Sequence, residues 1–227
     1  MESVNLGILF IVATPIGNLR DISMRAVDTL READYIRAED TRDADKLMRE
    51  YKIDVPVIAY TDEKHSRLIN KITNDLVSGK KIALISDSGT PTISDPGFKL
   101  VREIKDKDMP VVPIPGPSAL IAALSVSGLP SDKFIFLGFL PKSKTKRQEI
   151  ISHYGKFEAT IIIYESSHRI KPLITEVYKT LGNRKVSLAN DLTKFHELVL
   201  TTKLENLVKN DFKEKGEFVL MIAKEGF

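Results

Sequence analysis

Short apolar runs alternate with amphipathic stretches along the first two-thirds of the chain. The runs are bounded by turn residues and predict strands, whereas the stretches repeat apolar residues every three or four positions, as helices do. The predicted strands are Ile8–Ala13, Val57–Ala59, Lys81–Ser86, Val111–Ile114, Phe134–Phe139 and Thr160–Tyr164, and the predicted helices are Ile22–Glu32, Lys64–Val77, Phe98–Lys105, Ser118–Val126 and Thr145–His153. This alternation predicts an α/β protein in which helices cover a largely parallel sheet.

The last part of the chain has a different pattern. The segments Val186–Ala189, Glu197–Thr202 and Glu217–Ala223 alternate or are apolar, with only a short stretch between the last two, which predicts a mixed sheet with antiparallel strands. Between the two parts lies Pro113-Ile-Pro-Gly-Pro-Ser118, and three prolines so close together do not fit a central strand or a helix interior. We therefore expect two α/β domains, at residues 1–115 and 116–227.

Composition limits the classes of function. With 34 Lys and Arg against 31 Asp and Glu, the net charge of +3 permits a nucleic-acid partner, provided that its binding surface is local. The absence of cysteine excludes disulfides, thiolate catalysis and Cys-ligated zinc, and the four histidines show no metal-ligand spacing, so no metal is expected. No targeting or membrane-spanning segment is visible, and we expect a cytoplasmic protein that needs no membrane.

Three loops follow predicted strands and are rich in glycine, proline and hydroxyl side chains. They read VATPIGNL at 12–19, ISDSGTPTISDPG at 85–97 and PIPGPS at 113–118. Open α/β sheets bind ligands outside the carboxyl ends of their strands, so the three loops are candidate ligand sites. In the first loop Gly17 permits a positive φ or a close ligand approach. Each loop also has a purely structural interpretation: the first as an ordinary turn, the second as a self-contained surface loop and the third as a rigid hinge.

Four further segments carry charged groups. In AEDTR at 38–42 the acids suit a helix N-terminus that Thr41 could cap, while YESSHR at 164–169 and LTKFHE at 192–197 place ionisable side chains after predicted strands. The run KSKTKR at 142–147 is basic, and such a run positions RNA through its phosphates. The alternative for each is a surface network or a solvated loop.

Taken in order, these motifs resemble the 16S ribosomal RNA cytidine 2′-O-methyltransferase family of the tetrapyrrole-methylase superfamily. The resemblance rests on VATPIGNL, AEDTR, SDSGTPTISDPG, PIPGPSALIAALSVSGLP, GFLPK, YESSHR, LTKFHE and KGEFVL, and it runs from about residue 8 to residue 223. It implies a class III methyltransferase with two α/β domains and S-adenosylmethionine in the cleft between them. It also implies a homodimer that methylates a cytidine ribose in 16S ribosomal RNA, free or within the small ribosomal subunit.

Two alternatives share this fold. Tetrapyrrole C-methyltransferases acting on uroporphyrinogen or precorrin resemble the chain but carry a glycine-richer first loop of the type GxGPGD, where this chain has TPIGN at 14–18. A non-catalytic RNA-binding factor is the second alternative, and intact cofactor loops argue against it. The chain also departs from the family pattern, because Asn190-Asp191 replaces the usual Arg-Glu and Ser167 replaces a proline.

The chemistry of methyl transfer selects the candidate residues. The sulfonium charge is lost in the transition state, so backbone carbonyls and loop dipoles suit the cofactor better than a carboxylate against the sulfur. The cofactor candidates are Pro15, Gly17, Ser86, Asp87, Gly89, Thr90, Ile93, Pro115, Gly116 and Ser118. A ribose hydroxyl needs a base, for which Glu165, His168 and Lys194 are unranked candidates. The candidate RNA contacts are Arg42, Lys142, Lys144, Lys146, Arg147 and Arg169.

Overall fold

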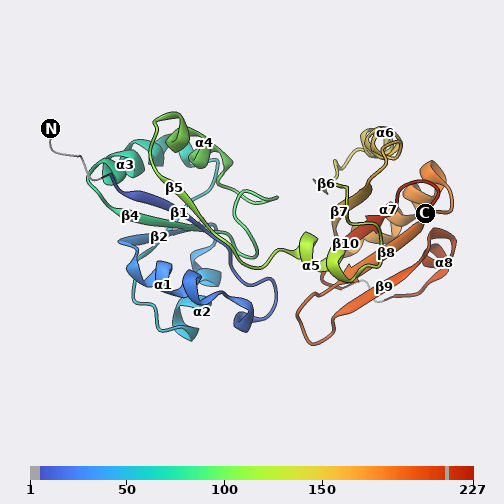
Figure 1. The fold of residues 1–227 in the computed structure, drawn as a ribbon, viewed down its shortest axis with the longest axis horizontal. Coiled ribbons are helices and arrows are strands. Elements are labelled where there is room, and N and C mark those ends of the chain that lie inside the picture. The colour runs from blue at the N-terminus through green and yellow to red at the C-terminus, as the bar shows by residue number, and fades with distance from the viewer. Residues whose placement is uncertain (1–5, 213–214) are drawn as a thin grey trace. The chain divides into compact units, whose positions relative to one another are not determined.

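A computed structural model describes residues 6–212 and 215–227. The chain divides into two compact units: the first ends at Ser118 and the second begins at Ala119 (Figure 1). Each unit has one five-stranded sheet with helices packed on it. The predicted fold class, two α/β domains of which the second has a mixed sheet, is confirmed.

The sheet of the first unit is entirely parallel. Its strands lie in the order β3-β2-β4-β1-β5, and every neighbouring pair runs in the same direction. The strands are β1 (Ile8–Val12), β2 (Tyr35–Ala38), β3 (Val57–Ala59), β4 (Lys81–Ile85) and β5 (Val111–Ile114). Because parallel strands need crossover connections, helices separate them in sequence and cover the sheet.

Helices cover both faces of this sheet (Figure 1). Alternate residues of a strand face opposite sides, so Ala83 and Ile85 of β4 pack with one pair of helices, while Ile82 and Leu84 pack with the other. The first pair is α1 (Met24–Glu32) and α2 (Thr41–Glu50), and the second is α3 (His65–Val77) and α4 (Phe98–Asp106). A short 3₁₀ helix, η1 (Leu19–Asp21), precedes α1. Burial on both faces explains why the strands read as continuous apolar runs.

Local pattern missed or misplaced three features of the first unit. The strand β2 was not predicted, because Arg37 interrupts its apolar pattern; the buried guanidinium of Arg37 lies over the Tyr35 ring. The helix α2 begins at Thr41, but the side chain of Asp40, not Thr41, caps it. Pro113 lies inside β5, where it is tolerated because β5 is an edge strand that leaves one side unpaired.

The sheet of the second unit is mixed, with the order β6-β7-β10-β8-β9. β6 and β7 are parallel, whereas the other three neighbouring pairs are antiparallel. The strands are β6 (Phe134–Phe139), β7 (Thr160–Ser166), β8 (Lys185–Asn190), β9 (Leu198–Lys203) and β10 (Glu217–Ile222). As a result β6, β7 and β8 end at one edge of the sheet, where β9 and β10 begin.

One face of the second sheet carries the core of this unit. Ile161, Ile163, Leu188 and Leu220 of the strands are buried against three helices. These are α6 (Lys144–Tyr154), α7 (Ser167–Leu181) and α8 (Leu204–Lys209). The helix α7 was not predicted; it holds Pro172, which removes one helical hydrogen bond. The helix α5 (Ala119–Val126) is tied to β7 through the Leu120 N–H, which donates to the Tyr164 hydroxyl at 2.8 Å.

Candidate functional site

The three ligand-site loops predicted from the sequence all lie at one edge of the first sheet. They follow β1, β4 and β5, and β1 is hydrogen-bonded to both other strands. Because all five strands are parallel, their carboxyl ends share this edge, which we call the first carboxyl edge. Neighbouring strands are about 4.8 Å apart, so the loops are adjacent in space although they are far apart in sequence.

Backbone hydrogen bonds join the first loop to the second. The Thr14 N–H donates to the Gly89 carbonyl at 2.8 Å, and the Gly89 N–H donates to the Thr14 carbonyl at 3.1 Å. The buried Thr14 hydroxyl also donates to the Ser86 carbonyl at 3.2 Å. Thr14 was not among the candidates from the sequence, although it is the first hydroxyl residue after an apolar strand. Gly89 has a φ of +78°, which favours glycine.

The third loop is joined to the other two. The Thr90 hydroxyl donates to the Pro117 carbonyl at 3.4 Å. Gly116 lies so close to the first loop that an added Cβ would be 3.0 Å from the Ala13 Cβ and 3.3 Å from the Ala13 carbonyl oxygen. A side chain at 116 would therefore push against the first loop at Ala13, directly after β1. The three loops are therefore connected to one another by hydrogen bonds and close contacts.

The remaining cofactor candidates differ in their surroundings. Ser86 is buried and its hydroxyl donates to carbonyls of its own loop, so it supports the loop instead of facing a ligand. Pro15 and Ser118 are partly exposed, while Gly17, Ile93 and Pro115 are exposed. Gly17 does not adopt a positive φ; in the second loop Thr92 and Ser94 do, at 75° and 66°. A β-branched residue in this region is strained, and such strain concentrates at functional sites.

Acidic groups line the same edge beside β2. The Asp87 carboxylate accepts a hydrogen bond from the Asp40 N–H at 2.9 Å, which ties the second loop to the start of α2. The Arg42 side chain is exposed and donates to Asp40, and these hydrogen bonds lower the pKa of Asp40 to about 2. Burial and the nearby Asp87 raise the pKa of Glu39. The edge therefore carries a negative potential suited to a cationic ligand.

In the second unit, three motifs meet at the edge where β6, β7 and β8 end, which we call the second carboxyl edge. The segment 138–142 ends β6, the motif 164–169 ends β7, and the motif 192–197 joins β8 to β9. The register places Ser166 opposite Glu217, Asn190 opposite Phe218, and Leu198 opposite Asn190. Residues that are far apart in the sequence of this unit therefore lie side by side along this edge of the sheet.

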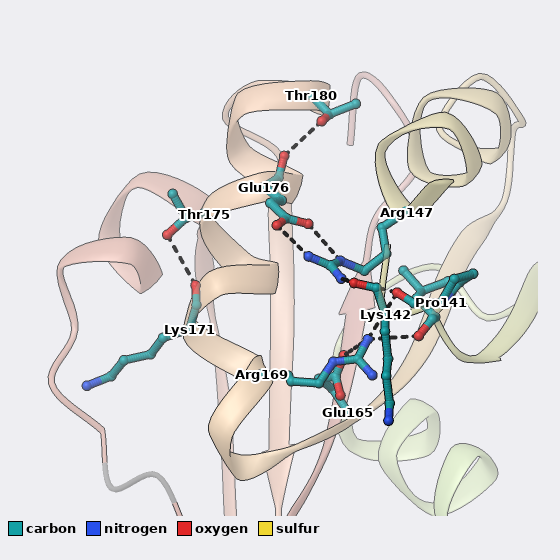
Figure 2. A network of polar contacts seen from close by, with 10 residues as sticks. Pro141, Lys142, Arg147, Glu165, Arg169, Lys171, Thr175, Glu176 and Thr180 are labelled. Atoms are coloured by element: carbon teal, nitrogen blue, oxygen red, sulfur yellow. Dashed lines mark hydrogen bonds and ion pairs between the residues drawn. The ribbon is translucent and has the colours of Figure 1, made fainter. Parts of the chain in front are cut away.

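Figure 2 shows that Arg147 belongs to an internal network. Its guanidinium donates two hydrogen bonds to Glu176, at 2.9 and 2.7 Å, and two more to the Pro141 and Lys142 carbonyls, at 3.1 and 2.7 Å. Only 12% of the Arg147 side chain is exposed, and the hydrogen bonds to Glu176 raise its pKa. Four of its five donors are thus used within the unit. The predicted RNA contact at Arg147 does not fit these surroundings.

Arg169 also donates hydrogen bonds to the backbone of this segment, at Leu140 and Pro141 (Figure 2). Its guanidinium donates to the Leu140 carbonyl at 2.8 Å and lies 3.1 Å from a carboxylate oxygen of Glu165. The Glu165 residue is only 1% exposed, and its other oxygen accepts a hydrogen bond from the Ser166 N–H at 2.8 Å. Two arginines, each held by a carboxylate, therefore fix the backbone of residues 140–142, an arrangement that we call the arginine clamp.

The three candidate bases have different surroundings. Glu165 is buried in the arginine clamp, and the Lys194 ammonium lies 3.2 Å from the Asp191 carboxylate. His168 is exposed in the first turn of α7, with its Nδ1 3.3 Å from the Ser167 hydroxyl. Within the described residues, its Nε2 has no hydrogen-bonding partner. Of the three, His168 alone offers an accessible nitrogen that can accept a proton.

The lysines of the basic run face solvent. Lys142, Lys144 and Lys146 are exposed, and none forms an ion pair with another described residue.

Asn190, which replaces an arginine of the family pattern, is buried, and its side-chain amide donates to the carbonyls of Lys215 and Glu217 at 3.0 and 3.1 Å. In residues 6–212 and 215–227, no group of three potential ligands could hold a metal ion, and no helix is long and apolar enough to cross a membrane.

The chain is similar to known proteins in sequence and in fold. A family model described as Tetrapyrrole (Corrin/Porphyrin) Methylases matches residues 9–208. A protein of Xylella fastidiosa named Ribosomal RNA small subunit methyltransferase I is 47% identical over 95% of this chain and 81% of its own. Proteins with the same name from Halalkalibacterium halodurans and Thermotoga maritima are 42% and 40% identical, over 97% and 96% of this chain and 77% and 99% of their own. A crystal structure of diphthine synthase has a similar fold, with a TM-score of 0.75 at 18% identity, over 96% of this chain and 90% of its own.

Proposed function

This chain belongs to the tetrapyrrole methylase family, and we propose that it transfers a methyl group from S-adenosylmethionine to the 2′-hydroxyl of a cytidine in 16S ribosomal RNA. The observation that carries the proposal is the match to relatives named Ribosomal RNA small subunit methyltransferase I, at 40–47% identity over at least 95% of this chain. We further propose a homodimer in the cytoplasm, supported by the family resemblance and, for dimerisation, by exposed apolar side chains such as Ile121 and Val126.

The direct test is to identify the methylated nucleosides of 16S ribosomal RNA that depend on this protein. RNA and small subunits from cells with and without this protein would be digested to nucleosides and analysed by mass spectrometry. We expect one ribose-methylated cytidine that depends on the protein. A methyl group on a base would overturn the choice of acceptor atom, and labelled methyl transfer to uroporphyrinogen in place of RNA would favour the tetrapyrrole alternative.

The first carboxyl edge fits the cofactor. S-adenosylmethionine, when bound, supplies a methyl group on a positively charged sulfur. The surroundings that suit it are backbone carbonyls close to the ligand and carboxylates further away, and the edge offers both. Loop backbone at Pro15, Thr90, Pro115 and Gly116 would hold it, with Gly17, Ile93 and Ser118 at the margin. Gly89 is buried and supports this site, because its N–H and its carbonyl are both hydrogen-bonded to Thr14. Asp87 and Glu39 supply the negative potential, and the buried hydroxyls of Ser86 and Thr14 hold the first and second loops in place through hydrogen bonds to loop carbonyls.

A methyl group added at Gly89 tests this assignment. Its Cβ would lie 3.5 Å from a methyl carbon of Ile16 and 4.0 Å from the Pro117 carbonyl oxygen, so the Gly89→Ala side chain fits the protein but stands between the first and third loops, which we propose hold the cofactor. The positive φ costs the fold about 1–2 kcal/mol. We expect S-adenosylmethionine affinity, measured by calorimetry, to fall about tenfold or more, which corresponds to about 1.4 kcal/mol per factor of ten.

The matched control is Gly128→Ala. Gly128 has a similar φ of +65°, and a Cβ there would meet nothing within 4 Å. It lies between α5 and β6 in the second unit and belongs to none of the three loops. The control should lose similar stability and keep full cofactor affinity. Equal affinities in the two variants would remove Gly89 from the cofactor site.

The three exposed lysines of the basic run are the proposed RNA contacts in the second unit. Arg147 and Arg169 are left out, because the arginine clamp engages them, and Arg42 remains a proposed contact in the first unit. Each phosphate contact with single-stranded RNA contributes about −0.7 to the slope of log affinity against log salt. Replacing Lys142, Lys144 and Lys146 by glutamine should therefore flatten the slope by roughly 2 units in filter binding.

The control replaces three other exposed lysines of the same unit, namely Lys133, Lys156 and Lys179. They lie near the starts of β6 and β7 and the end of α7, at the opposite edge of the sheet. Both triple variants lose the same charge, so a general electrostatic effect would change both slopes equally. A slope that is flattened equally in the two would contradict a local RNA surface at 142–146.

A further inference from the structure

We propose that Phe195 is a stacking platform for an unpaired nucleobase of the RNA substrate. The phenyl ring lies in the turn between β8 and β9 and is 96% exposed, more than any other large apolar side chain of the described residues. Hydrophobic stabilisation scales with the apolar area removed from water, so a ring this exposed adds almost nothing to the stability of the fold, and packing does not explain a phenylalanine here. The inference rests on the proposed function, since it assigns a specific contact to the RNA.

The turn that carries Phe195 has a defined conformation. Asp191 and Thr193 adopt positive φ angles of 47° and 65°, which are unfavourable for non-glycine residues. The Lys194 N–H donates to the Asp191 carbonyl at 3.0 Å, and the Thr193 N–H donates to the Glu197 carboxylate at 2.6 Å. These contacts hold the strained turn, and strain that is maintained in this way is typical of binding sites.

The base of the turn is anchored to β10. A Cβ at Gly216 would lie 2.3 Å from an Asp191 carboxylate oxygen, so only glycine lets the Asp191 side chain pack there. The Asn190 amide donates to the carbonyls of residues 215 and 217. The ring therefore stands on an ordered support, and a ligand that stacks on it has little backbone entropy to remove on binding.

The position and the neighbours of the ring favour RNA over a second protein chain. Phe195 lies at the second carboxyl edge with the candidate base His168, and the ends of β7 and β8 are two strand spacings, roughly 10 Å, apart. Lys194, His196 and Glu197 beside it are exposed and polar, whereas the cores of protein interfaces are depleted of charge. Single-stranded RNA is recognised by splayed bases that stack on aromatic rings.

The experiment uses the absence of tryptophan from this chain. The Phe195→Trp variant has a single indole at the proposed platform, and RNA fragments of 16S origin should quench and shift its fluorescence. The matched control is Phe157→Trp, because Phe157 is half-exposed and precedes β7 at the opposite edge of the sheet. It should fluoresce equally with and without RNA.

Affinity separates stacking from simple apolar contact. We expect RNA to bind Phe195→Ala about 5- to 150-fold more weakly than wild type, Phe195→Leu to remain weak, and Phe195→Trp to bind at least as well as wild type. S-adenosylmethionine affinity should be unchanged in all three. An unquenched indole at 195 or full RNA affinity of Phe195→Ala would overturn the platform, as would dissociation of a dimer by Phe195→Ala in light scattering. The proposed function fails separately, if wild-type protein does not methylate 16S RNA.

Discussion

Replacing His168 by alanine should lower kcat for RNA methylation by about 100- to 10,000-fold, the usual contribution of a positioned base. His168 is exposed at the second carboxyl edge, and its Nε2 has no partner within the described residues. A ribose hydroxyl must lose its proton as the oxygen attacks, and a free imidazole nitrogen can accept that proton. The KM for RNA and the affinity for S-adenosylmethionine should change little, because the loss falls on the chemical step.

The other two candidate bases provide the comparison. The Lys194 ammonium has no lone pair and is held by Asp191, so Lys194→Met should cost much less kcat than His168→Ala. Glu165 is buried against Arg169, so Glu165→Gln should act on stability more than on kcat. His153→Ala controls for loss of an exposed histidine, since His153 lies near the C-terminal end of α6. If Lys194→Met proves the more damaging variant, the base has been assigned to the wrong residue.

Reversing the charge of Arg147 should lower the free energy of unfolding by about 3–5 kcal/mol, the cost of breaking a buried ion pair. The change in Arg147→Glu leaves Glu176, which is buried, facing a like charge. It also removes the donors from the Pro141 and Lys142 carbonyls. Urea denaturation followed by circular dichroism measures the loss as a lower midpoint.

Two variants make this prediction specific. Lys146→Glu reverses a charge one residue away on the same helix, but Lys146 is exposed and has no ion-pair partner among the described residues, so its effect should lie within about ±0.5 kcal/mol. The exchange Arg147→Glu with Glu176→Arg restores opposite charges and should recover part of the loss. Equal stability of Arg147→Glu and Lys146→Glu would show that the arginine clamp does not hold this part of the fold.

The sequence by itself determined the α/β class, the mixed second sheet and the loops that follow β1, β4 and β5. These depend on short-range signals, namely apolar periodicity and the glycine and proline residues that end strands. The motifs also indicated the methyltransferase family, because their order and spacing are readable without a structure. The chain order of the strands did not reveal that the three loops are adjacent, which follows only from β1 pairing with both β4 and β5.

Only the tertiary structure decided which charged residues are available for function. In the basic run, three lysines are exposed while Arg147 is held by Glu176, a residue 29 positions away. Among the candidate bases, packing buries Glu165 and leaves His168 open. The side-chain amide of Asn190 is likewise hydrogen-bonded, to carbonyls 25 and 27 residues further along the chain. Burial and pairing of this kind depend on contacts between distant segments, whereas local pattern reports only the propensities of neighbouring residues.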